Sequence, residues 1–506
     1  MKHRLIFSGM GAALLASATA VGATDLRIAI ASDPDALDPT TTSTLAARQV
    51  FTTMCDKLLD IDAEVNFIPK LATEWSWSDD MMSLTLTLRE GVTFHDGEPF
   101  NADAVVYNIE RHKTLPGSNR APDISMITSA EAVDEHTVRI DLVEPSIPVI
   151  AALAETSGIM ISPKAAEEAG EDFAENPVCS GPYKFAERVP QDRIVLEKFE
   201  EYWKADDYQA DRLIYLPITD STVRLSNLRS GDVDIIERVA PSDLPTIEQD
   251  ANIRVEQITG LGSYYIVINI AGGDGSQTEN PLSQHVEVRE ALELSIDRDA
   301  LNQVANEGVF AVGNQPVPPN NPYYIEELPS PERDVARARD LIRDATGEDE
   351  AAFTMLLPNI PEYRRFGEII QAMASEAGID ITLETQETTT SLSNWANGNF
   401  EAYLIRWSGR SDPDGNLYTF KTCEGTRNGS RYCNEEVDRW LDESRRRSDP
   451  EERYEAFRNA AEHYMADRPY IYLFHPTELT GFRNAITGFT PVPDGLMRLG
   501  GVRIEG

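Results

Sequence analysis

The chain has 506 residues, more than one hydrophobic core usually supports, so we expect at least two lobes. Its 85 acidic residues outnumber 45 basic residues, and the formal net charge of -40 argues against nucleic acid or an anionic membrane as a partner. The acids are spread along the chain and form no acidic tail, which predicts a soluble, self-repelling surface.

The first 23 residues have the features of a secretory signal peptide. A basic start at residues 1–4 precedes an apolar and small-residue run over residues 5–21, and Val21, Gly22 and Ala23 form a cleavage pattern. Serine, glycine and threonine interrupt the run, which disfavours a membrane anchor. We therefore expect cleavage after Ala23 and a free periplasmic monomer. The first cysteine lies well beyond this site, so none is available there for lipid attachment.

In the first half of the chain, strands and helices alternate. Helical periodicity predicts a helix over residues 46–59, a helix capped by Asn101, and a helix over residues 221–230 that Gly231 ends. Alternating apolar side chains predict strands at residues 26–30, 83–89, 137–142, 182–185, 193–197, 213–218 and 233–236. This order is typical of an α/β fold.

A second series of strands and helices begins after two glycines at positions 260 and 262. Strands are predicted at residues 264–269, 353–357, 379–384, 403–406 and 470–474. Helices are predicted at residues 286–295, 331–345, 363–377, 434–444 and 451–465. The strand, helix, strand order over residues 353–384 predicts neighbouring parallel strands.

The four cysteines predict two disulfides in an exported chain. Cys423 and Cys433 flank a polar loop with two glycines, which favours a local bridge. Cys55 and Cys179 then form the second pair. A zinc site is the alternative, but the cysteines lack short paired spacings and a neighbouring histidine.

No catalytic or cofactor motif is present. The chain has no His-Glu-x-x-His, no Gly-x-Ser-x-Gly and no phosphate-binding Gly-x-x-x-x-Gly-Lys sequence. Asp412, Asp414 and Asn416 have the opening spacing of a calcium loop, but Leu417 and Cys423 occupy the positions of its glycine and final glutamate. We therefore expect a binding protein without catalytic residues, metal or cofactor. An exported hydrolase using paired carboxylates is the alternative from another class.

Four sets of residues follow one another in an order that matches a known family. They comprise residues 71–75, 88–91, 94–97, 99–100 and 102–103; residues 181–183, 192–193 and 202–203; residues 229 and 231–234; and residues 269, 288–289, 291–292 and 296–298. With these residues the chain resembles the dipeptide- and oligopeptide-binding proteins of ABC importers (solute-binding protein family 5, extracellular cluster C type).

The resemblance implies an α/β, bilobed periplasmic-binding-protein fold with two mixed-sheet lobes joined by a two-strand hinge. Lobe one would comprise residues 24–258 and 476–506, with an extra subdomain over about residues 51–185, and lobe two residues 259–475. The hinge crossings would lie near Gly260 and His475. Closure would bury a solute between the lobes and present both lobes to an ABC permease in the membrane. ATP would be hydrolysed by other subunits.

The resemblance also places two residues in the ligand pocket. Trp407 aligns with an aromatic residue that lines it, and Arg410 with the position where peptide binders commonly carry an aspartate for the ligand's ammonium group. A guanidinium repels an ammonium and attracts a carboxylate or phosphate. We therefore expect an anionic solute, such as an opine-like conjugate, a modified peptide or a sugar phosphate.

Two alternatives remain open for this segment. Arg410 could pair with Asp412 or Asp414 and only shape the loop. The protein could instead be a conventional di- or oligopeptide receptor in which Asp412 or Asp414 binds the ammonium group.

Further ligand candidates follow from their placement near strand ends. Thr42, Ser43 and Thr44 could donate hydroxyls, although helix capping explains them equally; Tyr265 and Asn269 lie on one face of a strand, where core packing is the alternative; Tyr363 and Arg365 begin a helix at a position suited to anions, where a solvated face is the alternative.

Overall fold

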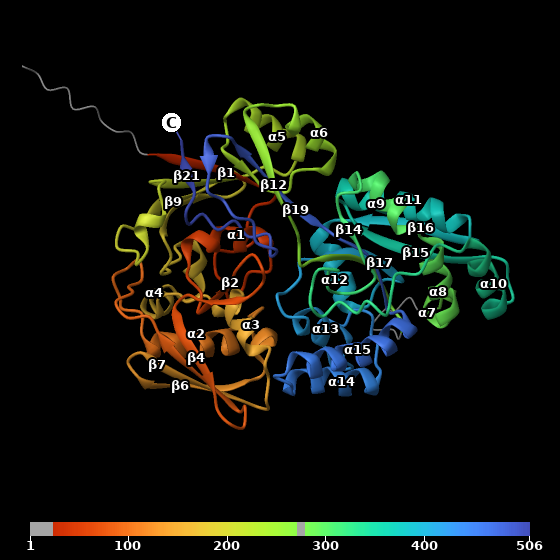
Figure 1. Cartoon of the computed structure of the whole chain (residues 1–506), viewed down its shortest axis with the longest axis horizontal. Coiled ribbons are helices and arrows are strands. Elements are labelled where there is room, and N and C mark those ends of the chain that lie inside the picture. The colour runs from red at the N-terminus through yellow and green to blue at the C-terminus, as the bar shows by residue number, and fades with distance from the viewer. Residues whose placement is uncertain (1–23, 271–278, 506) are drawn as a thin grey trace, which may run out of the picture.

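The computed structural model describes residues 24–270 and 279–505. The predicted cleavage site after Ala23 lies outside the described residues. Figure 1 shows two bodies connected by two long strands, β12 (Ile253–Thr259) and β19 (Thr477–Arg483). We call the body with a seven-stranded sheet lobe one and the body with a six-stranded sheet lobe two.

The seven-stranded sheet of lobe one has the order β12-β19-β11-β1-β10-β9-β8. The central strand β1 is parallel to both of its neighbours, and the other pairs are antiparallel. The remaining strands and the helices beside them are β1 (Asp25–Ile30), β8 (Tyr183–Val189), β9 (Arg193–Lys198), β10 (Arg212–Pro217), β11 (Ile235–Ile236), α1 (Leu45–Met54), α5 (Ser221–Ser230) and α6 (Leu244–Glu248). Ile28, Phe51 and Tyr215 belong to the core below this sheet.

Lobe one also contains a four-stranded antiparallel sheet with the order β4-β5-β7-β6. It lies within the residues for which we predicted an extra subdomain, and it has its own core around Leu86, Val105 and Ile140. Its elements and their neighbours are β2 (Leu59–Ile61), β3 (Phe67–Pro69), β4 (Ala72–Trp77), β5 (Ser83–Leu88), β6 (Ile127–Asp134), β7 (Thr137–Leu142), α2 (Ala102–Thr114), η1 (Ala121–Ile124), α3 (Val149–Ala154) and α4 (Pro163–Ala169).

The six-stranded sheet of lobe two has the order β14-β18-β13-β17-β15-β16. Its strands are β13 (Ser263–Ile268), β14 (Ala311–Val312), β15 (Ala351–Pro358), β16 (Ile379–Gln386), β17 (Ala402–Trp407) and β18 (Tyr470–His475). The helices are α7 (Pro281–Gln284), α8 (Val286–Ser295), α9 (Arg298–Asn306), α10 (Val335–Thr346), α11 (Pro361–Ser375), α12 (Thr388–Asn397), α13 (Asp414–Lys421), α14 (Glu435–Arg446) and α15 (Pro450–Asp467). The main core lies around Tyr264, Phe366 and Phe474.

The chain crosses between the two large sheets twice. It leaves lobe one after β12 and enters β13 through residues 260–262, and it returns between β18 and β19 at Pro476. After β19 the chain stays beside lobe one, where β20 (Ile486–Thr487) pairs with β21 (Arg503–Ile504). The crossings lie where we predicted the hinge, whereas the full residue ranges of the lobes and subdomain stay a prediction.

Most predicted elements are present. The predicted helices at residues 221–230 and 286–295 coincide with α5 and α8, and the predicted parallel pair is β15 with β16. Asn101 caps α2 by accepting a hydrogen bond from the Ala104 amide, and Gly231 ends α5 in the left-handed conformation. Two elements start later than predicted by more than one residue: β11 covers only the last two residues of the segment 233–236, and α10 begins at Val335.

The prediction of one helix over residues 46–59 is wrong. Helix α1 ends at Met54, and Cys55 is extended. Cys55 forms a disulfide with Cys179, and residues 59–61 form strand β2. The disulfide therefore joins the backbone after α1 to the segment around Cys179, where a continuing helix would not place it. Both predicted disulfides, Cys55–Cys179 and Cys423–Cys433, are present.

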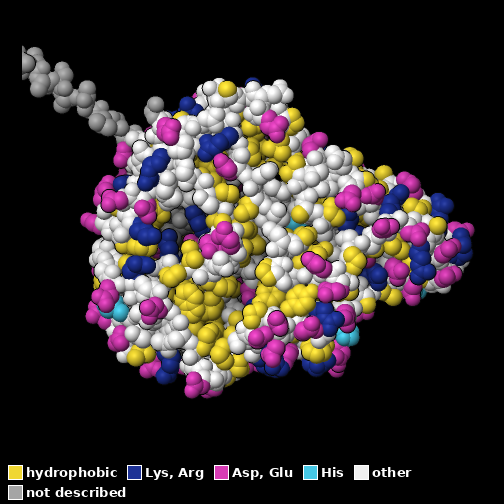
Figure 2. Space-filling view, viewed as in Figure 1, with side chains coloured by type: hydrophobic (Ala, Val, Ile, Leu, Met, Phe, Trp, Pro, Cys, Tyr) yellow, Lys and Arg dark blue, Asp and Glu magenta, His cyan; other side chains and the backbone are white. Residues whose placement is uncertain are grey.

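The surface agrees with the spread of acidic residues along the sequence. Figure 2 shows acidic side chains over much of the visible face, interspersed with lysine and arginine. Within residues 24–270 and 279–505, no helix is long and apolar enough to cross a membrane.

Candidate ligand site between the lobes

The segment after β17 turns sharply against the first hinge crossing. Gly409 adopts a left-handed conformation with φ of 81°. A Cβ atom there would lie 2.2 Å from the carbonyl oxygen of Leu261, so only glycine fits at this turn. The turn directs the chain from the end of the sheet into the space between the lobes.

Asn416 holds this turn in shape. Its Oδ1 accepts hydrogen bonds from the Trp407 indole Nε1 at 2.8 Å and from the Arg410 backbone amide at 2.9 Å. Its Nδ2 donates to the Arg410 carbonyl at 3.3 Å. The guanidinium of Arg410 lies 4.4 Å from the centre of the Trp407 ring, within the range of a cation–π contact. The structure therefore brings together the two residues that we predicted for the pocket.

Asp412 and Asp414 do not pair with Arg410. Asp412 accepts two hydrogen bonds from Arg453, at 2.6 and 2.7 Å, and Asp414 accepts two from Arg445, at 2.7 and 3.1 Å. All four side chains are buried. The alternative in which Arg410 pairs with one of these acids is therefore wrong for this structure.

Arg410 instead faces a cavity between the lobes. The cavity has a volume of about 60 Å³, and residues of both lobes line it. Lobe two contributes Arg410, Thr419, Arg427 and Arg445, and lobe one contributes Asp123, Met126, Ala151, Glu155 and Ser157. Among the described residues, Arg410 has no carboxylate within 4.0 Å; its Nη1 donates to the Ser408 hydroxyl at 3.3 Å and to the Gly409 carbonyl at 2.8 Å.

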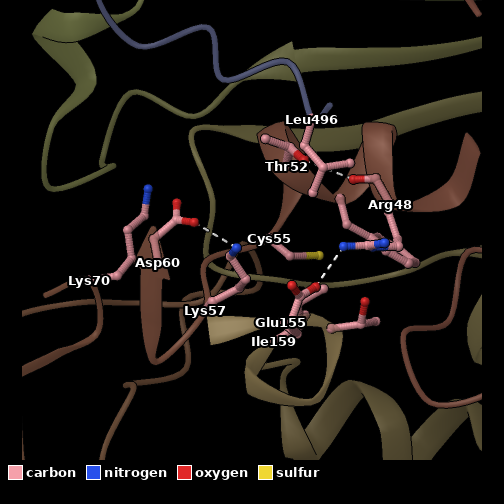
Figure 3. Close-up of a pocket in the computed structure, with 11 residues that line it drawn as sticks. Arg48, Thr52, Cys55, Lys57, Asp60, Lys70, Glu155, Ile159 and Leu496 are labelled. Carbon is pink, nitrogen blue, oxygen red and sulfur yellow. Dashed lines mark hydrogen bonds and ion pairs between the residues drawn. The ribbon is translucent and has the colours of Figure 1, made fainter. Parts of the chain in front are cut away.

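Three further arginines lie in ion pairs around this cavity. Arg120 and Arg427 both pair with Asp123 at 3.0 Å, so Asp123 bridges a residue of lobe one and a residue of lobe two. Arg48 on α1 pairs with Glu155 at 2.6 Å. Figure 3 shows Arg48 and Glu155 pointing toward each other in a neighbouring cavity of about 20 Å³. We call Arg48, Arg120, Arg410, Arg427, Asp123 and Glu155 the interlobe charge cluster.

The charge states of these groups depend on one another. Burial lowers the pKa of Arg410 to about 10, and the nearby Arg48 guanidinium acts in the same direction. Burial opposes ionisation of Asp123, yet the guanidiniums of Arg120 and Arg427 hold the pKa of Asp123 below its usual value.

The lobes are in contact beyond this cluster. Arg446 pairs with Glu144, and the Ile147 backbone amide donates to the Arg445 carbonyl at 3.0 Å. Each contact joins α14 to the segment before α3 of lobe one. The structure thus shows an arrangement in which both lobes enclose the cavity.

The hydroxyls of Thr42, Ser43 and Thr44 are turned toward Asp35. They donate to its carboxylate at 2.5, 2.9 and 2.7 Å, and Thr44 also caps α1. Arg120 of the charge cluster donates to the backbone carbonyl of Thr42 at 3.3 Å. A role for these three residues in ligand binding stays a prediction.

The lobe-two candidates lie at different distances from the predicted pocket. Tyr265 lines a cavity of about 10 Å³ together with Trp407, so these two predicted residues are neighbours. Asn269 is buried and donates to the Gly398 and Phe400 carbonyls. Tyr363 packs against the Tyr264 ring, and Arg365 donates to the Ala305 carbonyl at 3.1 Å. None of the last three lines the cavity beside Arg410.

Sequence reasoning missed Arg48, Arg120 and Arg427. They lie on α1, before η1, and in the loop between Cys423 and Cys433. No local pattern links positions so far apart in the chain. The one available signal was Arg427, a cation in the loop closed by the Cys423–Cys433 disulfide, which follows the Arg410 segment in the chain. Within the described part of the chain, no group of three or more histidine, cysteine or acidic residues could hold a metal ion.

Comparison with known proteins agrees with this architecture. Residues 66–428 match the family described as bacterial extracellular solute-binding proteins, family 5 Middle. Di/tripeptide-binding protein 1 of Pseudomonas aeruginosa is 28% identical over 533 residues, covering 98% of this chain and 97% of the relative. Glutathione-binding protein GsiB of Pectobacterium atrosepticum is 27% identical, with 97% and 96% covered.

A solved structure has the same fold. The periplasmic binding protein DppA of Helicobacter pylori in complex with the peptide STSA superimposes with a TM-score of 0.85 at 25% identity, covering 96% of this chain and 99% of that protein. The family consists of binding proteins and not of enzymes, so the hydrolase alternative is dropped. The match over most of its length shows that this chain belongs to the extracellular solute-binding proteins of family 5, the substrate-binding proteins of ABC importers.

Proposed function

We propose that this protein captures a small anionic solute, bearing a carboxylate or phosphate, between its lobes in the periplasm and delivers it to an ABC permease. The observation that carries the proposal is Arg410, a guanidinium at the interlobe cavity without an ion-pair partner among the described residues. Two properties of the guanidinium favour an anion: its fixed positive charge, and N–H donors spaced to match the oxygens of a carboxylate or phosphate. Opine-like conjugates, modified peptides and sugar phosphates fit this description.

The relatives named above bind di- and tripeptides or glutathione, so a conventional peptide receptor is the second candidate. That candidate needs a carboxylate for the ligand's ammonium group. Asp412 and Asp414 are both engaged in two-bond pairs with buried arginines, which argues against their serving an ammonium group. Asp123 and Glu155 line the cavity, but each is already paired with arginine.

The test begins with the natural ligand. Denaturing the purified protein and analysing the released material by mass spectrometry identifies the retained solute, and calorimetry then compares wild type with Arg410→Ala. We expect affinity for an anionic ligand to fall about tenfold to a hundredfold, because a charge-assisted hydrogen bond is lost. Arg343→Ala is the control, since Arg343 is exposed in lobe two and pairs there with Asp340 and Asp349.

Unchanged affinity of Arg410→Ala for the released ligand would contradict the proposal, as would a ligand whose only charged group is an ammonium. Arg410→Lys refines the result. A lysine keeps the charge but loses the fork of donors, so an intermediate affinity indicates that the two-bond geometry contributes.

A further inference from the structure

The interlobe charge cluster contains four guanidiniums and two carboxylates. Arg48 pairs with Glu155, while Arg120 and Arg427 share the single carboxylate of Asp123. Arg410 has no pair among the described residues. Asp123 can neutralise only one of the two arginines that it contacts, and Arg410 has no anion to neutralise it. The cluster therefore has two positive charges in excess.

Neighbouring acids do not balance this excess. Asp412 and Asp414 also lie beside the cavity, but Arg453 and Arg445 neutralise them one to one. Glu144, at the next contact between the lobes, pairs with Arg446. The excess is unusual in a chain whose formal net charge is -40.

Two of the arginines in the cluster have N–H groups that donate no hydrogen bond to the described residues, and one of these arginines is buried. Arg120 is only 7% exposed, and its Nε has no hydrogen-bond partner among the described residues. Arg410 donates from Nη1 alone, leaving its remaining N–H groups for another acceptor. Buried charges are costly unless an opposite charge accompanies them. The cluster is thus incomplete in the described protein and is suited to receive negative charge from a bound molecule.

We infer that the ligand enclosed at this cluster carries two negative charges, as two carboxylates or one phosphate monoester, and that Arg120 and Arg427 determine this preference together with Arg410. The inference rests on the proposed function and narrows it from an anion to a dianion. Two negative charges would neutralise the cluster on closure, when Asp123 joins Arg120 of lobe one to Arg427 of lobe two. A monoanion would leave one positive charge uncompensated between the lobes.

Two pairs of probes test the charge while keeping shape nearly constant. The carboxylate pair is N-acetyl-alanyl-glutamate, with two carboxylates, and N-acetyl-alanyl-glutamine, with one. The phosphate pair is glycerol phosphate and its methyl diester, which differ by one charge above the second phosphate pKa of about 6. Affinities are measured by calorimetry at pH 7.5 and constant ionic strength, because charge interactions depend on salt.

We expect the dianion to bind at least about tenfold more tightly than its monoanionic analogue in one of the two pairs. The pair that shows the preference identifies the source of the charge as carboxylate or phosphate. In Arg410→Gln the preference should shrink toward onefold. The double variant Arg48→Gln with Glu155→Gln removes one positive and one negative charge, so it keeps two positive charges in excess. This variant should retain the preference for the dianion.

Two results for the wild-type protein would overturn the inference without any variant. One is equal affinity for the dianion and the monoanion in both pairs, and the other is no measurable binding of either dianion. The proposed function has a separate criterion. A released natural ligand with a single negative charge and a strong dependence on Arg410 would sustain the proposed function while refuting the dianion. A ligand without an anionic group would refute both.

Discussion

Asp412 and Asp414 illustrate how a side chain beside a ligand cavity can serve the fold. Each accepts two hydrogen bonds from an arginine on a later helix, Arg453 of α15 and Arg445 of α14. These pairs attach the segment after β17 to the helical end of lobe two. Arg410 is left to face the cavity because its acidic neighbours are committed elsewhere.

The first residue-scale prediction concerns Asp412→Ala. Arg453 is 4% exposed, so removing Asp412 leaves a buried guanidinium without its anion. We expect the free energy of unfolding to fall by about 3–5 kcal/mol in urea denaturation followed by circular dichroism. Glu436→Ala is the matched control, because Glu436 pairs with Arg439 on an exposed helix face and its loss should lower the free energy of unfolding far less. Equal losses for the two variants would show that the Asp412 pair is not a structural anchor.

Sequence reasoning reached individual site residues unevenly. Arg410 was identifiable because it departs from an aligned family position within a recognisable segment. The sequence makes Asp412 a ligand candidate because it lies in the same segment as Arg410. Its structural role has no local signal, because its arginine partner lies 41 residues further along the chain. The partners of Arg410 in the charge cluster come from lobe one and become neighbours only when the lobes meet. Such contacts depend on tertiary arrangement, which local spacing does not encode.

At the scale of elements, periodic segments with clear ends were predictable. Helix α5 has an aspartate cap at Asp220 and a left-handed glycine at Gly231, and its predicted bounds were correct. Helix α1 was extended too far because the apolar pattern continues into β2, while the disulfide at Cys55 imposes an extended backbone. Helices α12 and α13 were missed because threonine, serine, glycine and asparagine are common in them and favour turns in isolation.

The element-scale prediction concerns the two disulfides, which close loops of very different length. Cys55–Cys179 spans 124 residues and Cys423–Cys433 spans 10. Restriction of the unfolded chain grows with loop length, and the entropic model gives about 5 and about 3 kcal/mol, respectively. We expect Cys55→Ser with Cys179→Ser to lower the free energy of unfolding by about 2 kcal/mol more than Cys423→Ser with Cys433→Ser. Urea denaturation of the two double variants checks the difference, and the reverse order would show that loop length does not determine the contribution.

At the scale of the whole molecule, two opposing electrostatic effects act together. Even if every lysine and arginine paired with an acid, an excess of 40 negative charges would remain to repel one another. Many observed ion pairs are exposed, such as Lys164–Glu98 and Arg343–Asp349, and pairs of this kind contribute little. The buried pairs, including Asp412–Arg453, are shielded from salt by the protein. Long-range repulsion is therefore the effect that salt changes most.

We accordingly expect sodium chloride to stabilise this protein at neutral pH. Raising its concentration from 0.1 to 1 M shortens the screening length from about 10 to about 3 Å, which weakens repulsion among the unpaired acids. The midpoint of thermal unfolding at pH 7.5, measured by calorimetry, should rise across this range. Near the isoelectric point, about 4.5 from the sequence, the net charge is close to zero and the same salt increase should leave the midpoint unchanged or lower it. A falling midpoint at pH 7.5 would mean that attractive ion pairs outweigh the repulsion, because screening would then remove more stabilising than destabilising interactions.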